Sequence, residues 1–254
     1  MKRKNNLKEK LMGGGNIIGT WSSMSSVNSV NAIGLTSLDF IIIDMEHGLM
    51  SFETAEKMVL AAEACGISPI IRTYDHYQQT LLRTLETGVM SIMVPHVKNA
   101  KDAKNIVKCC KYFPKGNRGL SPYTRVHDYN HLKVEKSTEL ENNNTFIGIL
   151  VEGKEGLKNL ENISKVPDID LIYLGLFDIC QSLGLPGQIN HPKVIEEVKR
   201  CEKIISSKGI APGSMAIDLP SIKFLKDQNY KFIAYLNDAA ALKQHYIDIL
   251  SKIW

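Results

Sequence analysis

The sequence predicts an α/β protein with a (β/α)8 TIM barrel fold. Strand-like apolar runs alternate with amphipathic, helix-like stretches almost to the end of the chain. Eight such runs occur in 254 residues, which suits a closed barrel better than an open doubly wound sheet. Gly66, Gly88 and Gly209 stand where helical patterns stop, as expected of the residue that best tolerates a left-handed helix end.

The elements are expected in the following order. An N-terminal helical segment covers residues 1–12, and a C-terminal helix covers about 239–254, so that residues 1–254 form a single barrel domain. The apolar runs predict strands at 17–21, 40–44, 69–72, 91–95, 147–152, 171–175, 211–215 and 232–236. The amphipathic stretches predict helices at 54–65, 78–87, 99–112, 154–166 and 192–208.

One connection breaks this rhythm. Residues 113–145 form a long segment that is rich in Pro, Gly and Asn. Loops of this length in a compact domain are often covers of active sites or contacts between subunits. We expect one of these two roles for the segment.

Composition and charge exclude several classes of protein. With 44% hydrophobic residues and a net charge of +4, the chain can form a full core and lacks the strong basic character of nucleic-acid-binding proteins. A basic cluster of Lys2, Arg3, Lys4, Lys8 and Lys10 is interpreted as a solvated helix end. No stretch approaches the roughly 20 apolar residues of a membrane span, and no apolar segment of a signal peptide follows the basic cluster. We therefore expect no nucleic-acid partner, no membrane association and a cytoplasmic location.

The five cysteines point to neither zinc nor disulfides. Their number is odd, and none of them forms a C-x-x-C pair. Most of them are expected to be small buried apolar residues.

Two carboxylates at strand ends are the strongest functional signal. Glu152 and Asp178 each follow an apolar run that is typical of a strand buried on both faces. The carboxyl ends of parallel barrel strands meet at the face where such barrels carry out their chemistry, so a divalent cation held by both acids is the simplest interpretation. Singly, either acid is equally well explained as an N-terminal residue of the next helix, where the helix dipole favours negative charge.

Other polar residues at strand ends suggest the remaining chemistry. A cation with open positions suits a 2-oxo acid such as pyruvate, whose enolate it would stabilise. Arg72 would add a second positive group at the substrate oxygen, and His47 would act as the base, with Glu86 orienting it. Arg72 could instead pair with a carboxylate inside the protein.

Three neighbouring residues have less specific interpretations. Asp44 and Glu46 are explained as a cap and a surface acid, and Glu46 is expected to point away from the pocket because adjacent side chains diverge. His96 is interpreted as an ordinary strand-end histidine near the rim.

Four motifs, taken together, resemble the HpcH/HpaI aldolase family. The similarity runs from about residue 18 to 238, and its motifs are Asp39-Phe-Ile-Ile-Ile-Asp-Met-Glu-His-Gly48, Arg118-Gly119 with Ser121-Pro122, Val151-Glu-Gly-Lys-Glu-Gly156, and Gly175-Leu-Phe-Asp178 with Gln181-Ser-Leu-Gly184. Members of this family include 4-hydroxy-2-oxoheptanedioate aldolase and 2-keto-3-deoxy sugar-acid aldolases.

The resemblance implies a metal-dependent pyruvate aldolase on a TIM barrel of the phosphoenolpyruvate/pyruvate type. It implies a Mg2+ or Mn2+ ion, or Co2+, bound by Glu152 and Asp178, and a hexamer built from dimers that exchange C-terminal helices. By the same resemblance Arg72 binds the pyruvate oxygen and His47 acts in acid-base catalysis with Glu86. The remaining substrate-binding positions are Trp21, which falls where the family has an aromatic pocket wall, and Gly175 and Phe177 in the turn that meets the pyruvate carboxylate.

The chain departs from the family pattern at three positions. Glu86 stands where the family usually has Asp, and Leu150 stands where it usually has Gln, so a polar contact near the metal is expected to be missing. The family's Gly-Pro-x-Asp turn is Gly175-Leu176-Phe177-Asp178 here, which lacks the rigidity of proline.

The sequence thus predicts a carbon-carbon lyase that cleaves a 4-hydroxy-2-oxo acid into pyruvate, or a related 2-oxo acid, and an aldehyde. Two alternatives remain open. One is a citrate-synthase-like condensing enzyme that uses the same enolate chemistry. The other is a metal-binding homologue with weakened or no catalysis, which Leu150 and Leu176 favour.

Overall fold

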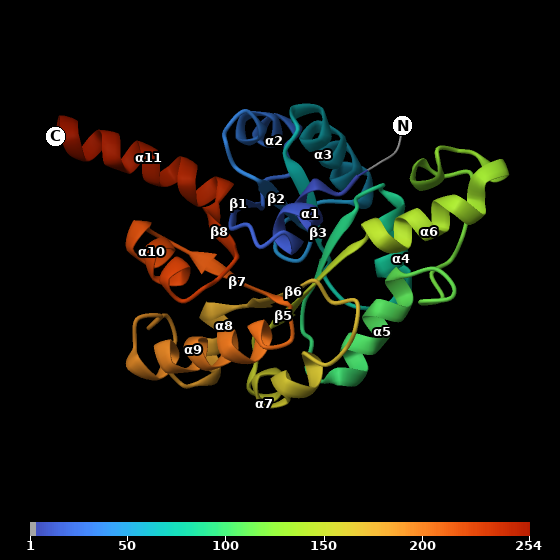
Figure 1. The fold of residues 1–254 in the computed structure, drawn as a ribbon. Helices are drawn as coiled ribbons and strands as arrows, with labels where there is room; N and C mark the ends of the chain where they lie inside the picture. Colours follow the sequence, from blue (N-terminus) through green and yellow to red (C-terminus); the bar gives the residue numbers. More distant parts are fainter. Residues whose placement is uncertain (1–3) are drawn as a thin grey trace.

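The computed structural model describes residues 4–254, which form a closed barrel of eight parallel strands surrounded by helices (Figure 1). The strands pair in sequence order, and the last pairs with the first. Their bounds are β1 (Ile17–Ser22), β2 (Phe40–Asp44), β3 (Ser68–Arg72), β4 (Ser91–Val94), β5 (Phe146–Val151), β6 (Leu171–Leu174), β7 (Ala211–Ala216) and β8 (Phe232–Asn237). The predicted barrel is confirmed, and each strand end lies within one residue of its predicted place.

The helices connect and cap the barrel. They are α1 (Asn6–Met12), α2 (Val27–Gly34), α3 (Phe52–Cys65), α4 (Gln78–Glu86), α5 (Ala100–Cys110), α6 (Val134–Asn144), α7 (Lys154–Ile163), α8 (Leu176–Ser182), α9 (Pro192–Ser206), α10 (Leu219–Asp227) and α11 (Asp238–Ile253). The five helices predicted between strands correspond to α3, α4, α5, α7 and α9. Gly66, Gly88 and Gly209 adopt positive φ angles of 79°, 87° and 72°, as the glycine positions predicted. The predicted N-terminal segment 1–12 includes residues 1–3, which lie outside the described part of the chain.

Aromatic side chains fill the interior of the barrel. Phe40 and Phe232 stack with their ring centroids 4.0 Å apart, and Phe146 lies in the same buried cluster. Helix α1 closes the end of the barrel where the strands begin, and its Leu7 and Leu11 are buried in that cluster. Burial of this aromatic and aliphatic surface stabilises the fold. The polar side chains gather at the other end of the barrel, where the strands end.

The long connection at 113–145 lies at the end of the barrel where the strands begin. It follows the C-terminal end of α5 and contains two short 3-10 helices, η1 (Arg125–His127) and η2 (His131–Lys133), before α6 leads into β5. The first of its two expected roles, a cover over the C-terminal ends of the strands, is therefore wrong within one protomer. A role as a subunit contact stays a prediction.

One member of the basic cluster, Lys8, is less solvated than expected, whereas Lys4 and Lys10 are exposed as predicted. Lys8 Nζ lies 3.0 Å from Oδ1 of Asp170, and the two side chains are only 15% and 10% exposed. Lys8 therefore ties α1 to the start of β6 instead of facing solvent. Lys2 and Arg3 of the same cluster lie outside the described residues.

Most of the cysteines are buried, as predicted. All five cysteines are free thiols, and four of them, Cys109, Cys110, Cys180 and Cys201, are buried. Across residues 4–254, no helix has both the length and the apolar character that crossing a membrane requires.

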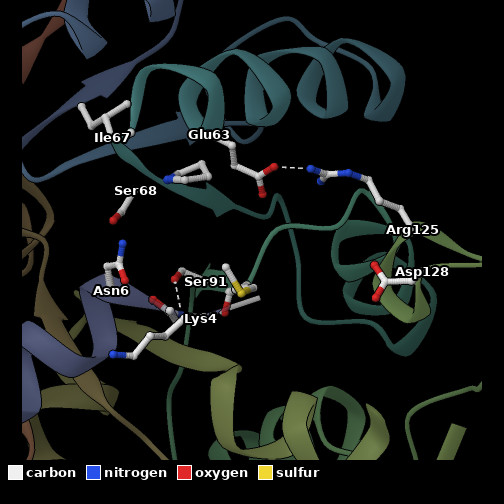
Figure 2. Close-up of a pocket in the computed structure, with 12 residues that line it drawn as sticks. Lys4, Asn6, Glu63, Ile67, Ser68, Ser91, Arg125 and Asp128 are labelled. Atoms are coloured by element: carbon white, nitrogen blue, oxygen red, sulfur yellow. Dashed lines mark hydrogen bonds and ion pairs between the residues drawn. The ribbon is translucent and has the colours of Figure 1, made fainter. Parts of the chain in front are cut away.

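A pocket of about 450 Å3 opens at the end of the barrel where the strands begin, next to the start of α1 (Figure 2). Ser68 and Ser91, the first residues of β3 and β4, line it. Its polar groups already contact one another, because Arg125 pairs with Glu63 across the opening and Asn5 donates to the hydroxyl of Ser91. These contacts hold α1, α3 and η1 against the barrel, on the face away from Glu152 and Asp178.

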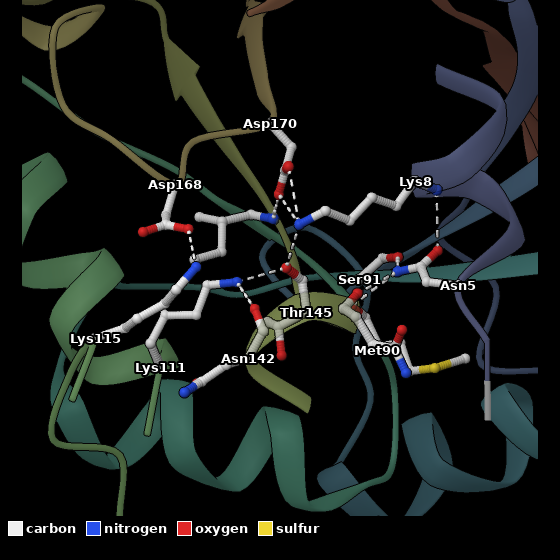
Figure 3. Close-up of polar contacts among 12 residues, drawn as sticks. Asn5, Lys8, Met90, Ser91, Lys111, Lys115, Asn142, Thr145, Asp168 and Asp170 are labelled. Atoms are coloured by element: carbon white, nitrogen blue, oxygen red, sulfur yellow. Dashed lines mark hydrogen bonds and ion pairs between the residues drawn. The ribbon is translucent and has the colours of Figure 1, made fainter. Parts of the chain in front are cut away.

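At the same end of the barrel, a buried lysine that follows α5 contacts α6 and the residue before β5 (Figure 3). Lys111 is fully buried, and its Nζ donates to the carbonyl oxygens of Asn142 at 2.6 Å and of Thr145 at 2.9 Å. Lys8 donates to the same Thr145 oxygen. Burial, followed by the positive charge of Lys8, lowers the pKa of Lys111 to about 8. Two carbonyl acceptors are satisfied even by a neutral amine, which carries two N–H groups.

Removal of this amine should change how stability depends on pH. A lysine in an unfolded chain has a pKa of about 10.4. Between pH 8 and pH 10 the unfolded state therefore binds more protons at Lys111 than the folded state, so this group's contribution to the free energy of unfolding rises with pH. We expect the difference in unfolding free energy between wild type and Lys111→Met to increase by about 2 kcal/mol over that range, measured by urea denaturation at constant ionic strength. Lys115→Met, which removes a more exposed lysine paired with Asp168, should show no such trend. A constant difference for Lys111→Met would show that Lys111 is charged throughout.

Candidate active site

Five consecutive strands deliver acidic side chains, an arginine and a histidine to one rim of the barrel. Asp44 ends β2 and is followed by Glu46, while Arg72 ends β3. His96 lies just after β4, Glu152 directly after β5, and Asp178 in the first turn of α8, which follows β6. We refer to Asp44, Arg72, Glu46, His96, Glu152 and Asp178 as the rim array. These strand-end residues lie at one rim, as the barrel fold predicted.

A buried ion pair begins the array. The parallel register sets Asp44 beside Arg72 on neighbouring strands. Arg72 donates from Nε to Oδ1 of Asp44 at 2.9 Å and from Nη2 to Oδ2 at 2.6 Å, and both side chains are less than a tenth exposed. Its guanidinium also lies over the ring of Trp21, 4.5 Å from the centroid. The alternative interpretation of Arg72, an internal carboxylate partner, is thus correct, and each terminal nitrogen still has a second N–H for another acceptor.

Glu46 points into the array, contrary to the sequence interpretation. Its Oε2 forms an ion pair with Nη1 of Arg72 at 3.0 Å, and its Oε1 lies 2.8 Å from Nε2 of His96. Adjacent side chains point in opposite directions only within a regular strand. Here β2 has already ended at Asp44, whose Oδ1 accepts the backbone N–H groups of both Glu46 and His47. This tight turn directs Glu46 back over Arg72.

His96 is also more than an ordinary strand-end residue. Its Nδ1 lies 2.8 Å from Oε1 of Glu152, and its backbone N–H donates to the same oxygen at 3.0 Å. The imidazole therefore bridges Glu46 and Glu152. No spacing rule in the sequence signals this bridge, because the three residues come from three different strand ends.

Glu152 and Asp178 face the same small space. The register pairs Val151 with Leu174, so the next residues, Glu152 and Gly175, lie side by side. A Cβ placed on Gly175 would lie 3.2 Å from Oε2 of Glu152 and 3.4 Å from Oδ2 of Asp178. Glycine thus keeps open the space between the two carboxylates. Burial raises the pKa of Glu152, and the nearby charge of Asp178 raises it further, although the backbone N–H and ring of His96 act in the opposite direction.

The acids offer a donor set suited to a small hard cation. A Mg2+-like ion typically binds one or two carboxylates and keeps its other positions for water and substrate. Within residues 4–254 no group of three or more His, Cys, Asp or Glu side chains is arranged to hold a metal ion, so a site at this rim would be formed by Glu152 and Asp178 alone.

The structure does not bring Glu86 to His47. His47 is exposed and follows β2, at the same end of the barrel as the rim array. Glu86 ends α4, at the other end of the barrel, where it accepts from Nη2 of Arg118 at 3.1 Å. The predicted pair is therefore not formed within one protomer, because Glu86 lies at the end of α4 that precedes β4, whereas His47 follows the end of β2.

The remaining predicted residues lie around the same rim. Trp21 is buried and donates from Nε1 to the hydroxyl of Tyr173 at 3.2 Å, forming a wall beneath Arg72. Phe177 is 47% exposed, in the first turn of α8 next to Gly175. Leu150 is buried in the barrel interior with Trp21, so the wall below the acids is apolar at this position.

Comparison with known proteins identifies relatives of the whole barrel. Residues 18–242 match the family model described as HpcH/HpaI aldolase/citrate lyase. A hydroxypyruvate/pyruvate aldolase from Roseobacter denitrificans is 29% identical, covering 94% of this chain and 93% of its own. A 2-dehydro-3,6-dideoxy-6-sulfogluconate aldolase from Pseudomonas putida is 30% identical, covering 89% and 88%. The crystal structure of the citrate synthase SbnG is 26% identical, with a TM-score of 0.88 and coverage of 97% and 96%.

Filling the space between the acids should separate ligand binding from folding. Gly175 has a φ of −75°, which any residue adopts, so Gly175→Ala should fold normally. Its Cβ would lie 3.0 Å from that of Glu152 and would displace the carboxylate. We expect Mn2+ affinity, measured by the EPR signal of the free ion, to fall at least about 10-fold. Gly153→Ala is the matched control, because nothing lies within 4 Å of its added Cβ. Equal affinities in the two variants would show that the ion binds elsewhere.

Proposed function

Because the chain belongs to the HpcH/HpaI aldolase/citrate lyase family, we propose that it is an aldolase that cleaves a 4-hydroxy-2-oxo acid into pyruvate, or a related 2-oxo acid, and an aldehyde. The observation that carries this proposal is the pair of carboxylates, Glu152 and Asp178, which converge on the space kept open by Gly175. The relatives named as aldolases for pyruvate and for a sugar acid support it.

Glu152 and Asp178 would hold a divalent cation, Mg2+ or Mn2+, as the hard oxygen donors suggest. When bound, such an ion supplies a Lewis acid that stabilises the negative charge of an enolate. The substrate's 2-oxo acid end would then lie above the rim array. The apolar wall of Trp21 and Leu150 would limit the water that reaches it.

Arg72 and His47 would carry the other steps. Arg72 is fixed by Asp44 and has one free N–H on each terminal nitrogen, which can donate to the substrate oxygen that gains charge. His47 would take the proton of the 4-hydroxyl group as the bond between C3 and C4 breaks. The electron pair of that bond goes to the enolate of the 2-oxo acid, the aldehyde leaves, and protonation at C3 gives the free 2-oxo acid.

Exchange of pyruvate methyl protons with solvent tests this proposal without knowledge of the aldehyde. In D2O with Mg2+, the wild type should exchange these protons, seen as loss of the methyl signal by 1H NMR. Glu152→Gln and Asp178→Asn should each slow the exchange at least about 100-fold, because both remove a charge from the cation site. Glu155→Gln, an exposed acid on α7, is the matched control and should exchange at the wild-type rate. Absence of exchange in the wild type would favour a non-catalytic, metal-binding protein.

A second candidate is a condensing enzyme that joins the same enolate to an acyl donor. The similarity to the citrate synthase SbnG favours it. Acetyl-CoA with oxaloacetate separates the two candidates, since only the condensing enzyme releases free thiol in this assay.

The C-terminal helix supports a homo-oligomer. Figure 1 shows α11 projecting away from the barrel, and Asp238 is its only residue buried in the described chain. Its apolar side chains recur at helical spacing and are exposed, namely Leu242, Tyr246, Ile249, Leu250 and Ile253. Such a stripe on a projecting helix fits a second copy of this chain, and a hexamer of helix-exchanging dimers is the assembly that the family resemblance implies.

Charges on this stripe should reduce the assembly. We expect the double variant Leu242→Asp/Leu250→Asp to have a smaller mass than wild type by light scattering, with an unchanged far-UV circular dichroism spectrum. Gln244→Asp, on the polar face of the helix, should keep the wild-type mass. A monomeric wild type would contradict the proposal.

A further inference from the structure

Two contacts join His96 to the same oxygen of Glu152. Its Nδ1 lies 2.8 Å from Oε1, and its own backbone N–H donates to Oε1 at 3.0 Å. Both contacts fall on the same oxygen, although a carboxylate has two. They fix the carboxylate's rotation as well as its position.

The second oxygen of Glu152 is turned the other way. Oε2 lies 3.2 Å from the position of a Cβ on Gly175, and Oδ2 of Asp178 lies 3.4 Å from that same position. One oxygen of Glu152 is therefore occupied by His96, and the other is presented toward Asp178. Glu152 therefore offers a single oxygen, Oε2, to a ligand.

His96 is itself held in place. Its φ angle is 60°, a left-handed conformation that histidine adopts more readily than most residues and that bends the chain toward Glu152 just after β4. The other ring nitrogen, Nε2, lies 2.8 Å from Oε1 of Glu46. Glu46 in turn pairs with Arg72, which Asp44 fixes on the neighbouring strand. The imidazole is 55% exposed, and each of its ring nitrogens contacts a carboxylate.

We propose that His96 is a positioning residue that makes Glu152 a one-oxygen ligand and thereby favours a small octahedral cation over Ca2+. The inference rests on the cation site of the proposed function. Ca2+ takes six to eight oxygens and often uses both oxygens of a carboxylate, whereas Mg2+ requires near-ideal octahedral geometry with few protein ligands. Blocking Oε1 removes the two-oxygen mode that Ca2+ uses, and it leaves the mode that Mg2+ and Mn2+ use.

Two variants isolate the imidazole. His96→Gly removes the side chain but keeps the backbone N–H and tolerates a φ of 60°. His96→Asn also tolerates this φ and keeps a side-chain donor near Oε1. Urea denaturation without metal is expected to show that both variants are folded.

The test measures metal binding, independently of activity. Free Mn2+ is followed by EPR, and Ca2+ is added as a competitor. We expect His96→Gly to bind Mn2+ about 10- to 100-fold more weakly than wild type. We also expect it to lose at least about 10-fold of the Mn2+ over Ca2+ preference. His96→Asn should recover most of both.

The outcomes distinguish this inference from the function on which it rests. If the wild type binds no Mn2+, the cation site itself is wrong. If the wild type binds Mn2+ but His96→Gly matches it in affinity and in Ca2+ competition, only the positioning role is overturned. A 14N coupling to bound Mn2+ in pulsed EPR that disappears in His96→Gly would make His96 a direct ligand and would also overturn the positioning role.

Discussion

The candidate site depends on one buried ion pair, that between Asp44 and Arg72. A buried charge is tolerated only when it is paired and hydrogen-bonded, and here the register of β2 and β3 sets the two residues side by side with two aligned hydrogen bonds. Asp44 also accepts the backbone N–H groups of Glu46 and His47, so it shapes the turn that follows β2. The remainder of the array is built on this pair, since Glu46 is placed by it and His96 is held through Glu46.

The two ends of the barrel divide stability from chemistry. At one end, Lys111, Lys8 and Asn5 join α1 and the 113–145 segment to the starts of the strands through buried hydrogen bonds. At the other end the rim array leaves charged groups facing one another across short turns. This division is typical of barrels of this class. It explains why the 113–145 segment, although long and rich in loop-forming residues, does not cover the acids of its own barrel.

Much of this arrangement could be predicted from the sequence, for identifiable reasons. Strands such as β2 and β5 are uninterrupted apolar runs, and a barrel sends every strand end to the same rim, so Glu152, Asp178 and Arg72 could be placed together without coordinates. Glu46 and His96 could not be placed in this way. Their directions depend on a turn made by Asp44 and on a left-handed φ at His96, which are set by tertiary contacts and not by periodicity. Glu86 does not reach His47 within one protomer, because Glu86 ends α4 shortly before β4 begins, whereas His47 follows the end of β2.

The distribution of charge along the array favours its far end for the proposed cation. Asp44, Arg72 and Glu46 alternate in sign, so each charge has an opposite neighbour. Glu152 and Asp178 come last and have like charge, with His96 touching only one of them. Burial and the neighbouring carboxylate raise the pKa of Glu152, which means that the folded chain disfavours the very ionised form that a metal requires. A bound divalent cation would favour the ionised form of Glu152, whereas protonation would remove its charge. Both contacts from His96 fall on Oε1 of Glu152, while Oε2 faces Asp178 and the space beside Gly175.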